Sequence, residues 1–142
     1  MSANGRVILD TGPLVALLNR RDSHHHWAKA RFADLMPPLM TCEPVLSEAC
    51  FLLRRLPGAP RAVLQLLERG VLEIPFRLDA ESGAVGALMH RYASVPMALA
   101  DACLVRMAEQ HPGSAVMTLD SDFRIYRLQG RKVVPTVMPD QS

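Results

Sequence analysis

The sequence predicts an α/β fold in which a parallel sheet carries helices on both faces, and three observations support this prediction. Short apolar runs typical of buried strands alternate with longer segments whose apolar residues recur at the helical period. Helical crossovers between parallel strands are right-handed, which leaves few other topologies open. The chain has 142 residues, of which 49% are hydrophobic and 21% charged, and this fits one domain over residues 1–142.

The expected elements follow one another in a regular order. The run from Arg6 to Asp10 predicts the first strand, and the "TGP" that follows turns the chain into a helix over Pro13 to Asn19. The other expected strands are Leu39 to Cys42, Val71 to Pro75, Ala115 to Leu119 and Lys132 to Pro135. The other expected helices are Ser23 to Met36, Pro44 to Leu56, Pro60 to Arg69, Asp79 to Tyr92 and Pro96 to Gln110. The tail after Pro135 is expected to be irregular.

Bulk properties exclude several classes of protein. The net charge is +2 and the pI about 8.6, a bias too small to name a partner. The N-terminal "MSANGR" lacks the pattern of a signal peptide, and no apolar run approaches the roughly 18 residues of a membrane span. Cys42, Cys50 and Cys103 are odd in number and form no CxxC pair, which predicts buried free thiols. We therefore expect a cytoplasmic protein without a membrane partner.

Acidic residues lie near the expected carboxyl ends of the strands, where open parallel sheets bind ligands. Asp10 closes the first strand, and Asp120 and Asp122 follow "AVMTL". Glu48 and Asp101 each lie one turn into a helix, and each is the single charge of an apolar segment. Unpaired carboxylates buried in this way are costly unless they bind a cation. The pattern predicts a hard divalent ion, Mg²⁺ or Mn²⁺, and metal-assisted hydrolysis of a phosphodiester.

Each acid also has an alternative interpretation when it is considered alone. Asp10 fits an N-cap, because "DTGP" has the chemistry of a helix start. Glu48 fits a surface ion pair with Arg54, and Asp101 fits a helix-start acid favoured by the macrodipole. The two acids of "TLDSDF" fit an ordinary turn. The joint pattern, rather than any single residue, indicates a metal site.

Four segments resemble, in order, the motifs of PIN-domain ribonucleases, in particular the VapC-type toxins of toxin–antitoxin pairs. The segment "VILDTGPLVALLNRRDSHH" resembles the opening strand, first acid and short helix of that family. The segment "TCEPVLSEACFLL" resembles its second-strand region with a helix-borne Glu. The segments "MALADACLVRMAEQ" and "AVMTLDSDFRIYR" are similar to its third and fourth motifs. The resemblance covers nearly the whole chain.

This resemblance implies a three-layer α/β/α sandwich around a five-stranded parallel sheet with the strand order 3-2-1-4-5. It implies divalent-metal-dependent endonucleolytic cleavage of RNA. It also implies two kinds of protein partner, a second copy in a homodimer and a small antitoxin. Such an antitoxin is expected to insert an Arg that pairs with the carboxylates in place of the metal.

The resemblance further implies roles for particular residues. Those expected to hold Mg²⁺ or Mn²⁺ and to form the catalytic site are Asp10, Glu48, Asp101 and Asp120. Asp122 is the alternative to Asp120 as the fourth ligand, with a water between it and the metal. Thr11 and Thr118 are expected to orient carboxylates or water through their hydroxyls.

Other features point away from competing sites. The run "SHHH" from Ser23 to His26 suggests a metal site, but consecutive histidines on a helix point in different directions, so we expect them to face solvent. No complete GxGxxG or Walker loop and no nucleophile elbow is present, so neither a nucleotide cofactor nor covalent hydrolysis is expected. Scattered basic residues are expected on a solvated face, with phosphate positioning as the alternative. These residues are Arg20, Arg21, Arg54, Arg55, Arg124 and Arg127.

Two rival functions remain open on the sequence alone. The first is a PIN-like nuclease of RNA maturation or decay that has no antitoxin. The second is a non-catalytic protein-interaction module whose acids hold structure or receive a basic partner segment. Metal titration separates the second from an enzyme, because an enzyme should bind Mn²⁺ at the acidic cleft.

Overall fold

The central sheet of the computed structural model, which describes residues 5–139, is parallel throughout and has the strand order β3-β2-β1-β4-β7. Its strands are β1 (Val7–Leu9), β2 (Leu39–Met40), β3 (Leu72–Glu73), β4 (Ala115–Met117) and β7 (Thr136–Val137). Each strand is short and two of the β1 residues are fully buried, as apolar runs between turns predict. The predicted order 3-2-1-4-5 is confirmed, with β7 as the fifth strand.

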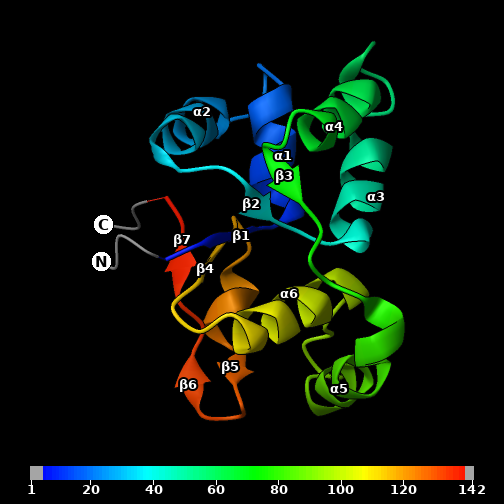
Figure 1. Cartoon of the computed structure of the whole chain (residues 1–142), viewed down its shortest axis with the longest axis vertical. Helices are drawn as coiled ribbons and strands as arrows, with labels where there is room; N and C mark the ends of the chain where they lie inside the picture. Colours follow the sequence, from blue (N-terminus) through cyan, green and yellow to red (C-terminus); the bar gives the residue numbers. More distant parts are fainter. Residues whose placement is uncertain (1–4, 140–142) are drawn as a thin grey trace.

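Helices cover both sides of this sheet, as the predicted sandwich requires. They are α1 (Thr11–Leu18), α2 (His25–Asp34), α3 (Glu43–Leu52), α4 (Ala59–Glu68), α5 (Leu78–Arg91) and α6 (Leu99–Gln110). Figure 1 shows α1 to α4 grouped in the upper half of the molecule and α5 and α6 in the lower half, with β1, β2 and β4 between the two groups. Pro44 and Pro60 lie in the first turns of α3 and α4, where proline needs no N–H partner.

The last part of the fold differs from the prediction. Lys132–Val133 forms β6, which pairs antiparallel with β5 (Arg127–Leu128) in a separate two-stranded sheet. The turn at Gln129 and Gly130 has positive φ angles, and it folds these residues back on β5 before they can reach β4. The residues after Pro135, expected to be irregular, form β7 and complete the parallel sheet. The predicted strand over Lys132 to Pro135 was therefore placed too early in the chain.

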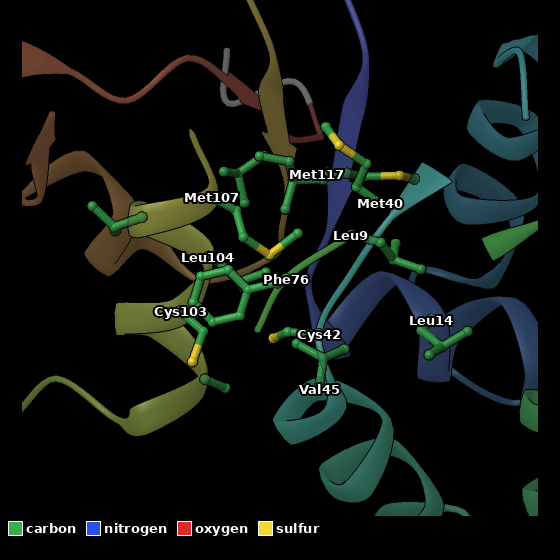
Figure 2. Close-up of a cluster of buried hydrophobic side chains, with 14 of the residues drawn as sticks. Leu9, Leu14, Met40, Cys42, Val45, Phe76, Cys103, Leu104, Met107 and Met117 are labelled. Carbon is green, nitrogen blue, oxygen red and sulfur yellow. The ribbon is translucent and has the colours of Figure 1, made fainter. Parts of the chain in front are cut away.

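The hydrophobic core lies between α6, the sheet and α3. Figure 2 shows Leu104 and Met107 of α6 near Met117 of β4 and Phe76, with Met40 of β2 farther from the helix. All five are buried. Cys42 and Cys103 are also buried, as predicted, whereas Cys50 is half-buried. The methionines of this core act as packing residues, for which their flexible side chains are suited.

The register of β1 and β4 brings two distant segments together at the carboxyl edge of the sheet. Leu9 of β1 lies beside Met117 of β4, and the Asp10 amide donates to the Met117 carbonyl at 3.0 Å. Asp10 and Thr118, each one residue past its strand, therefore meet although 108 positions separate them. None of the helices in the described part of the chain is long and apolar enough to cross a bilayer.

Candidate active site

The five acids predicted from the sequence line one open pocket of about 630 Å³ at the carboxyl edge of the sheet. They are Asp10, Glu48, Asp101, Asp120 and Asp122. They come from the end of β1, from α3, from α6 and from the segment after β4, so the topology gathers residues that are far apart in the chain. Asp22, from the loop between α1 and α2, is a sixth carboxylate in the lining. No Lys or Arg is among the described lining residues.

Asp10 is the most buried of these acids, with 7% of its surface exposed. Its Oδ1 accepts from the Thr11 amide at 2.7 Å, and its Oδ2 accepts from the Thr118 hydroxyl at 2.6 Å. Burial raises the pKa of Asp10 to about 6, against the lowering effect of these two hydrogen bonds, and the charges of Asp101 and Asp120 add to the rise. Asp10 is also the N-cap of α1, as the alternative interpretation of this residue predicted. It therefore caps the helix and lines the pocket at the same time.

Glu48 reaches the pocket from α3 but is not buried as its apolar neighbours in sequence suggested. The residue is exposed, and its Oε1 accepts from the Thr11 hydroxyl at 2.8 Å. The sequence misled because Phe51 and Leu52, on the same helix, are themselves 60% and 58% exposed. Arg54, the alternative partner of Glu48, instead donates to the Phe51 carbonyl and lies over the Phe51 ring.

Asp101 lies in the first turn of α6 and is half-buried. Its Oδ2 accepts from the Tyr126 hydroxyl at 2.9 Å. Burial raises the pKa of Asp101 in spite of this bond, and the nearby charges of Asp120 and Glu48 raise it further. The pKa values of Asp10 and Asp101 therefore both respond to neighbouring carboxylates, which shows that acids from different elements lie close enough to interact.

Asp120 and Asp122 are held by a tight turn after β4. The Asp120 amide donates to the Thr118 hydroxyl at 2.9 Å, and Asp120 Oδ1 accepts from the Asp122 amide at 2.9 Å as the N-cap of the 3₁₀ helix η1 (Ser121–Arg124). Thr118 thus contacts both Asp10 and Asp120. Asp120 and Asp122 therefore form the predicted turn and also line the pocket.

Gly12 allows the first and fourth motifs to approach closely at this point. A Cβ atom at Gly12 would lie 3.2 Å from both Cβ and Cδ1 of Leu119, which is tighter than ordinary contact. Both residues line the pocket. The glycine in "DTGP" is therefore explained by the approach of α1 to the segment that carries Asp120.

The donor set of the pocket fits a hard divalent cation. Carboxylate oxygens are the ligands that Mg²⁺ and Mn²⁺ prefer. A cation would favour the ionised forms of Asp10 and Asp101, whose pKa values are raised mainly by burial and further by neighbouring carboxylates. Within residues 5–139, no three His, Cys, Asp or Glu side chains are arranged as a ready-made metal-binding group. The acids surround the pocket more widely, an arrangement compatible with an ion such as Mg²⁺ that keeps several of its own waters.

Two parts of this site were not predicted from the sequence, namely the loop that carries Asp22 and His24, and the side chain of Tyr126. Asp22 and His24 line the pocket, although the "SHHH" run was expected to face solvent. The Asp22 carboxylate accepts from the His24 amide at 2.8 Å, a turn that the Asp-Ser-His order could have indicated. Tyr126 was also missed. Its neighbours in sequence, Ile125 and Arg127, are not buried, so nothing local indicated that its ring is buried with a hydroxyl that needs a partner.

The basic residues singled out in the sequence lie outside the described lining of the pocket. Arg20, Arg21, Arg55 and Arg124 are exposed. Arg127 donates to the backbone carbonyls of residues 124, 125 and 126, so it stabilises the local chain. Phosphate positioning by the exposed arginines stays a prediction.

Comparison with known proteins places this geometry in a family. The chain resembles the crystal structure of VapC20 from Mycobacterium tuberculosis, a sarcin-ricin loop cleaving toxin, with a TM-score of 0.72 and 24% identity over 82% of this chain and 91% of that one. No curated protein matches the chain significantly. The family model of the PIN domain matches residues 7–128. The chain therefore belongs to the PIN domain family, as its four motifs predicted.

Proposed function

We propose that this protein is a divalent-metal-dependent endoribonuclease that hydrolyses RNA phosphodiester bonds as the toxin of a toxin–antitoxin pair. The observation that carries the proposal is the pocket of six carboxylates, gathered from separate elements and without Lys or Arg in its described lining. A polyanion such as RNA does not enter such a pocket unless cations first neutralise it. Membership of the PIN domain family supports nuclease activity, and the likeness to a VapC toxin supports the toxin class.

In the proposed mechanism, Asp10, Glu48, Asp101 and Asp120 would hold Mg²⁺ or Mn²⁺, with Asp122 as the alternative to Asp120. A divalent ion bound there would neutralise phosphate charge and lower the pKa of an attacking water. Thr118 fixes the Asp10 carboxylate through a 2.6 Å hydrogen bond, which keeps the deepest ligand in one orientation.

Thr11 has a related role in this proposal. Its amide donates to Asp10 and its hydroxyl donates to Glu48, so one residue spaces two carboxylates from different elements. Such bonds keep the oxygens pointing into the pocket before RNA arrives, which lowers the cost of ordering them on binding.

The proposed partner is a small antitoxin that inserts a basic side chain into the pocket. The pocket continues into an apolar surface groove lined by Ser47, Glu48, Phe51 and Leu52. A partner segment with apolar residues beside an Arg would cover Phe51 and Leu52 and pair with the carboxylates. Two further parts of the proposal come from the family resemblance, a homodimer and a cytoplasmic site of action, since cellular RNA is the substrate. The sarcin–ricin loop that the VapC20 toxin cleaves is the first RNA to test.

Cleavage of a ribosomal RNA fragment by purified protein tests the enzyme proposal. Wild-type protein should cleave with Mn²⁺ or Mg²⁺ and stop cleaving with EDTA, and Asp101→Asn should lose at least about 100-fold in rate, as expected for the loss of a metal ligand. Glu68→Gln is the matched control, because Glu68 is exposed on α4 outside the pocket lining and its loss should leave the rate unchanged.

Two outcomes would favour the rivals. Cleavage that persists in Asp101→Asn after rigorous purification means that the assigned site is wrong. Mn²⁺ binding without cleavage of any RNA tested, together with capture of a basic partner segment, favours a non-catalytic interaction module. A genuine nuclease with no antitoxin gene beside its own favours RNA maturation or decay.

A further inference from the structure

Tyr126 is a buried tyrosine whose hydroxyl is directed at a pocket carboxylate. It is 0% exposed and does not belong to the pocket lining. The hydroxyl donates to Asp101 Oδ2 at 2.9 Å across 25 positions of sequence. A buried hydroxyl needs a partner, and this one has found a carboxylate rather than a backbone carbonyl.

The Tyr126 ring is held rigidly by two aromatic neighbours. Its centroid is 5.2 Å from that of Phe123, at an interplanar angle of 84°, and 5.1 Å from that of Tyr92, at 66°. Phe123 is fully buried and anchors the segment in the core. These edge-to-face contacts fix the ring, so the hydroxyl offers Asp101 a donor at a defined position.

The same short segment also carries two acids of the pocket. Asp120 and Asp122 line the pocket. Tyr126 follows four residues after Asp122 and bonds to Asp101 of α6 from outside the pocket lining. The segment from Asp120 to Tyr126 therefore links the carboxylates after β4 to the carboxylate of α6. One rigid piece of chain sets the distance between acids that come from two different elements.

We propose that Tyr126 is a positioning residue of the active site, whose hydroxyl holds the Asp101 carboxylate in the orientation that binds the divalent ion. This inference rests on the proposed function and adds a residue that does not itself touch ion or RNA. Hydrogen-bond partners of this kind orient metal-ligating carboxylates, and their loss typically weakens metal binding about 10- to 100-fold. The Tyr126 hydroxyl bonds to Oδ2 of Asp101 and does not occupy Oδ1, the second oxygen of that carboxylate.

The chain offers a closely matched control in Tyr92. Its hydroxyl accepts from the Arg127 amide at 3.0 Å, and its ring belongs to the same aromatic cluster. Tyr126→Phe and Tyr92→Phe each remove one hydroxyl and one hydrogen bond while keeping the ring. Only the first removes a bond to a pocket acid. A purely structural role would give the two variants similar effects.

Calorimetric titration with Mn²⁺ in the absence of RNA is the test. Tyr126→Phe should raise the dissociation constant by about 10-fold, and Tyr92→Phe should leave it unchanged. The double variant Asp101→Asn with Tyr126→Phe should bind Mn²⁺ as Asp101→Asn does, because Tyr126 acts through Asp101. Cleavage by Tyr126→Phe should fall at limiting Mn²⁺ and recover at high Mn²⁺, with the KM for RNA unchanged.

Three results overturn the inference. Unchanged Mn²⁺ binding by Tyr126→Phe refutes it while leaving the proposed function intact. A loss of the same size in the Asp101→Asn background refutes it as well, since the effect would then not pass through Asp101, and this comparison holds even where thermal unfolding shows the variants to be less stable. Wild-type protein that neither binds Mn²⁺ nor cleaves RNA overturns the proposed function and this inference together.

Discussion

Replacement of Asp10 by Asn should change how the stability of the protein depends on pH. Asp10 has a pKa of about 6 in the native state against an ordinary value of 3.8, mainly because it is buried. The native state therefore binds this proton more tightly than the unfolded chain does. Stability falls as pH rises from about 4 to about 6, and the full penalty is present above that window.

The size of the penalty follows from the two pKa values. A difference of about two units, at about 1.4 kcal/mol each, corresponds to about 3 kcal/mol at neutral pH. About 2.5 kcal/mol of this develops between pH 4 and pH 7.5. Asn carries no charge, so Asp10→Asn escapes the penalty. It still presents an amide N–H₂ to Thr118, but that cost is the same at every pH.

Urea unfolding of wild type and Asp10→Asn in EDTA, at several pH values, measures this effect. The free energy of unfolding of the variant minus that of wild type should grow by about 2.5 kcal/mol from pH 4 to pH 7.5. Glu68→Gln should show no such trend, because Glu68 is exposed. Saturating Mn²⁺ at pH 7.5 should reverse the order by stabilising wild type alone. A difference that stays constant with pH would refute burial of an ionisable Asp10 as the cause.

Three further predictions concern the supports of the site and the sheet. Thr118→Val should lower the free energy of unfolding at pH 7.5 by about 2 kcal/mol in urea titrations, since it removes a charge-assisted bond to Asp10, whereas Thr118→Ser should stay near wild type. Phe123→Ala should cost about 3–5 kcal/mol through a core cavity, whereas Phe51→Ala, at an exposed position, should cost little by thermal unfolding. Truncation after Pro135 should lower the Tm and speed hydrogen exchange of the Thr118 amide, because this amide donates to the Val137 carbonyl of β7. Unchanged exchange would contradict the placement of that strand.

The sequence was sufficient to predict the alternation of strands and helices, because the periods of apolar residues reflect burial within each element. Helix ends were predicted to within a few residues where proline or a capping side chain fixes them, as at α3 and α4. The final strand was misplaced because a local hairpin competes for Lys132–Val133, and its positive-φ turn at Gln129 has no strong signal. Local pattern cannot show which of two possible pairings a short segment will make.

Acids that line the pocket could also be selected from the sequence, because a single charge within an apolar segment is visible without any structure. Which of those charges is buried was not readable. Asp10 is deeply buried and Glu48 is exposed, although both have apolar neighbours in sequence.

By itself, the amino-acid order determined the layered parallel fold, the strand order through family resemblance, and the set of carboxylates near the strand ends. Only the tertiary structure decided that Thr118 bonds Asp10, that Tyr126 bonds Asp101, and that Asp22 and His24 line the same pocket. The physical reason is the sequence separation over which each kind of interaction acts. Periodicity and capping act over a few residues, whereas the hydrogen bonds and charge interactions that set the pocket join residues separated by up to 108 positions and depend on burial that exists only after the chain has folded.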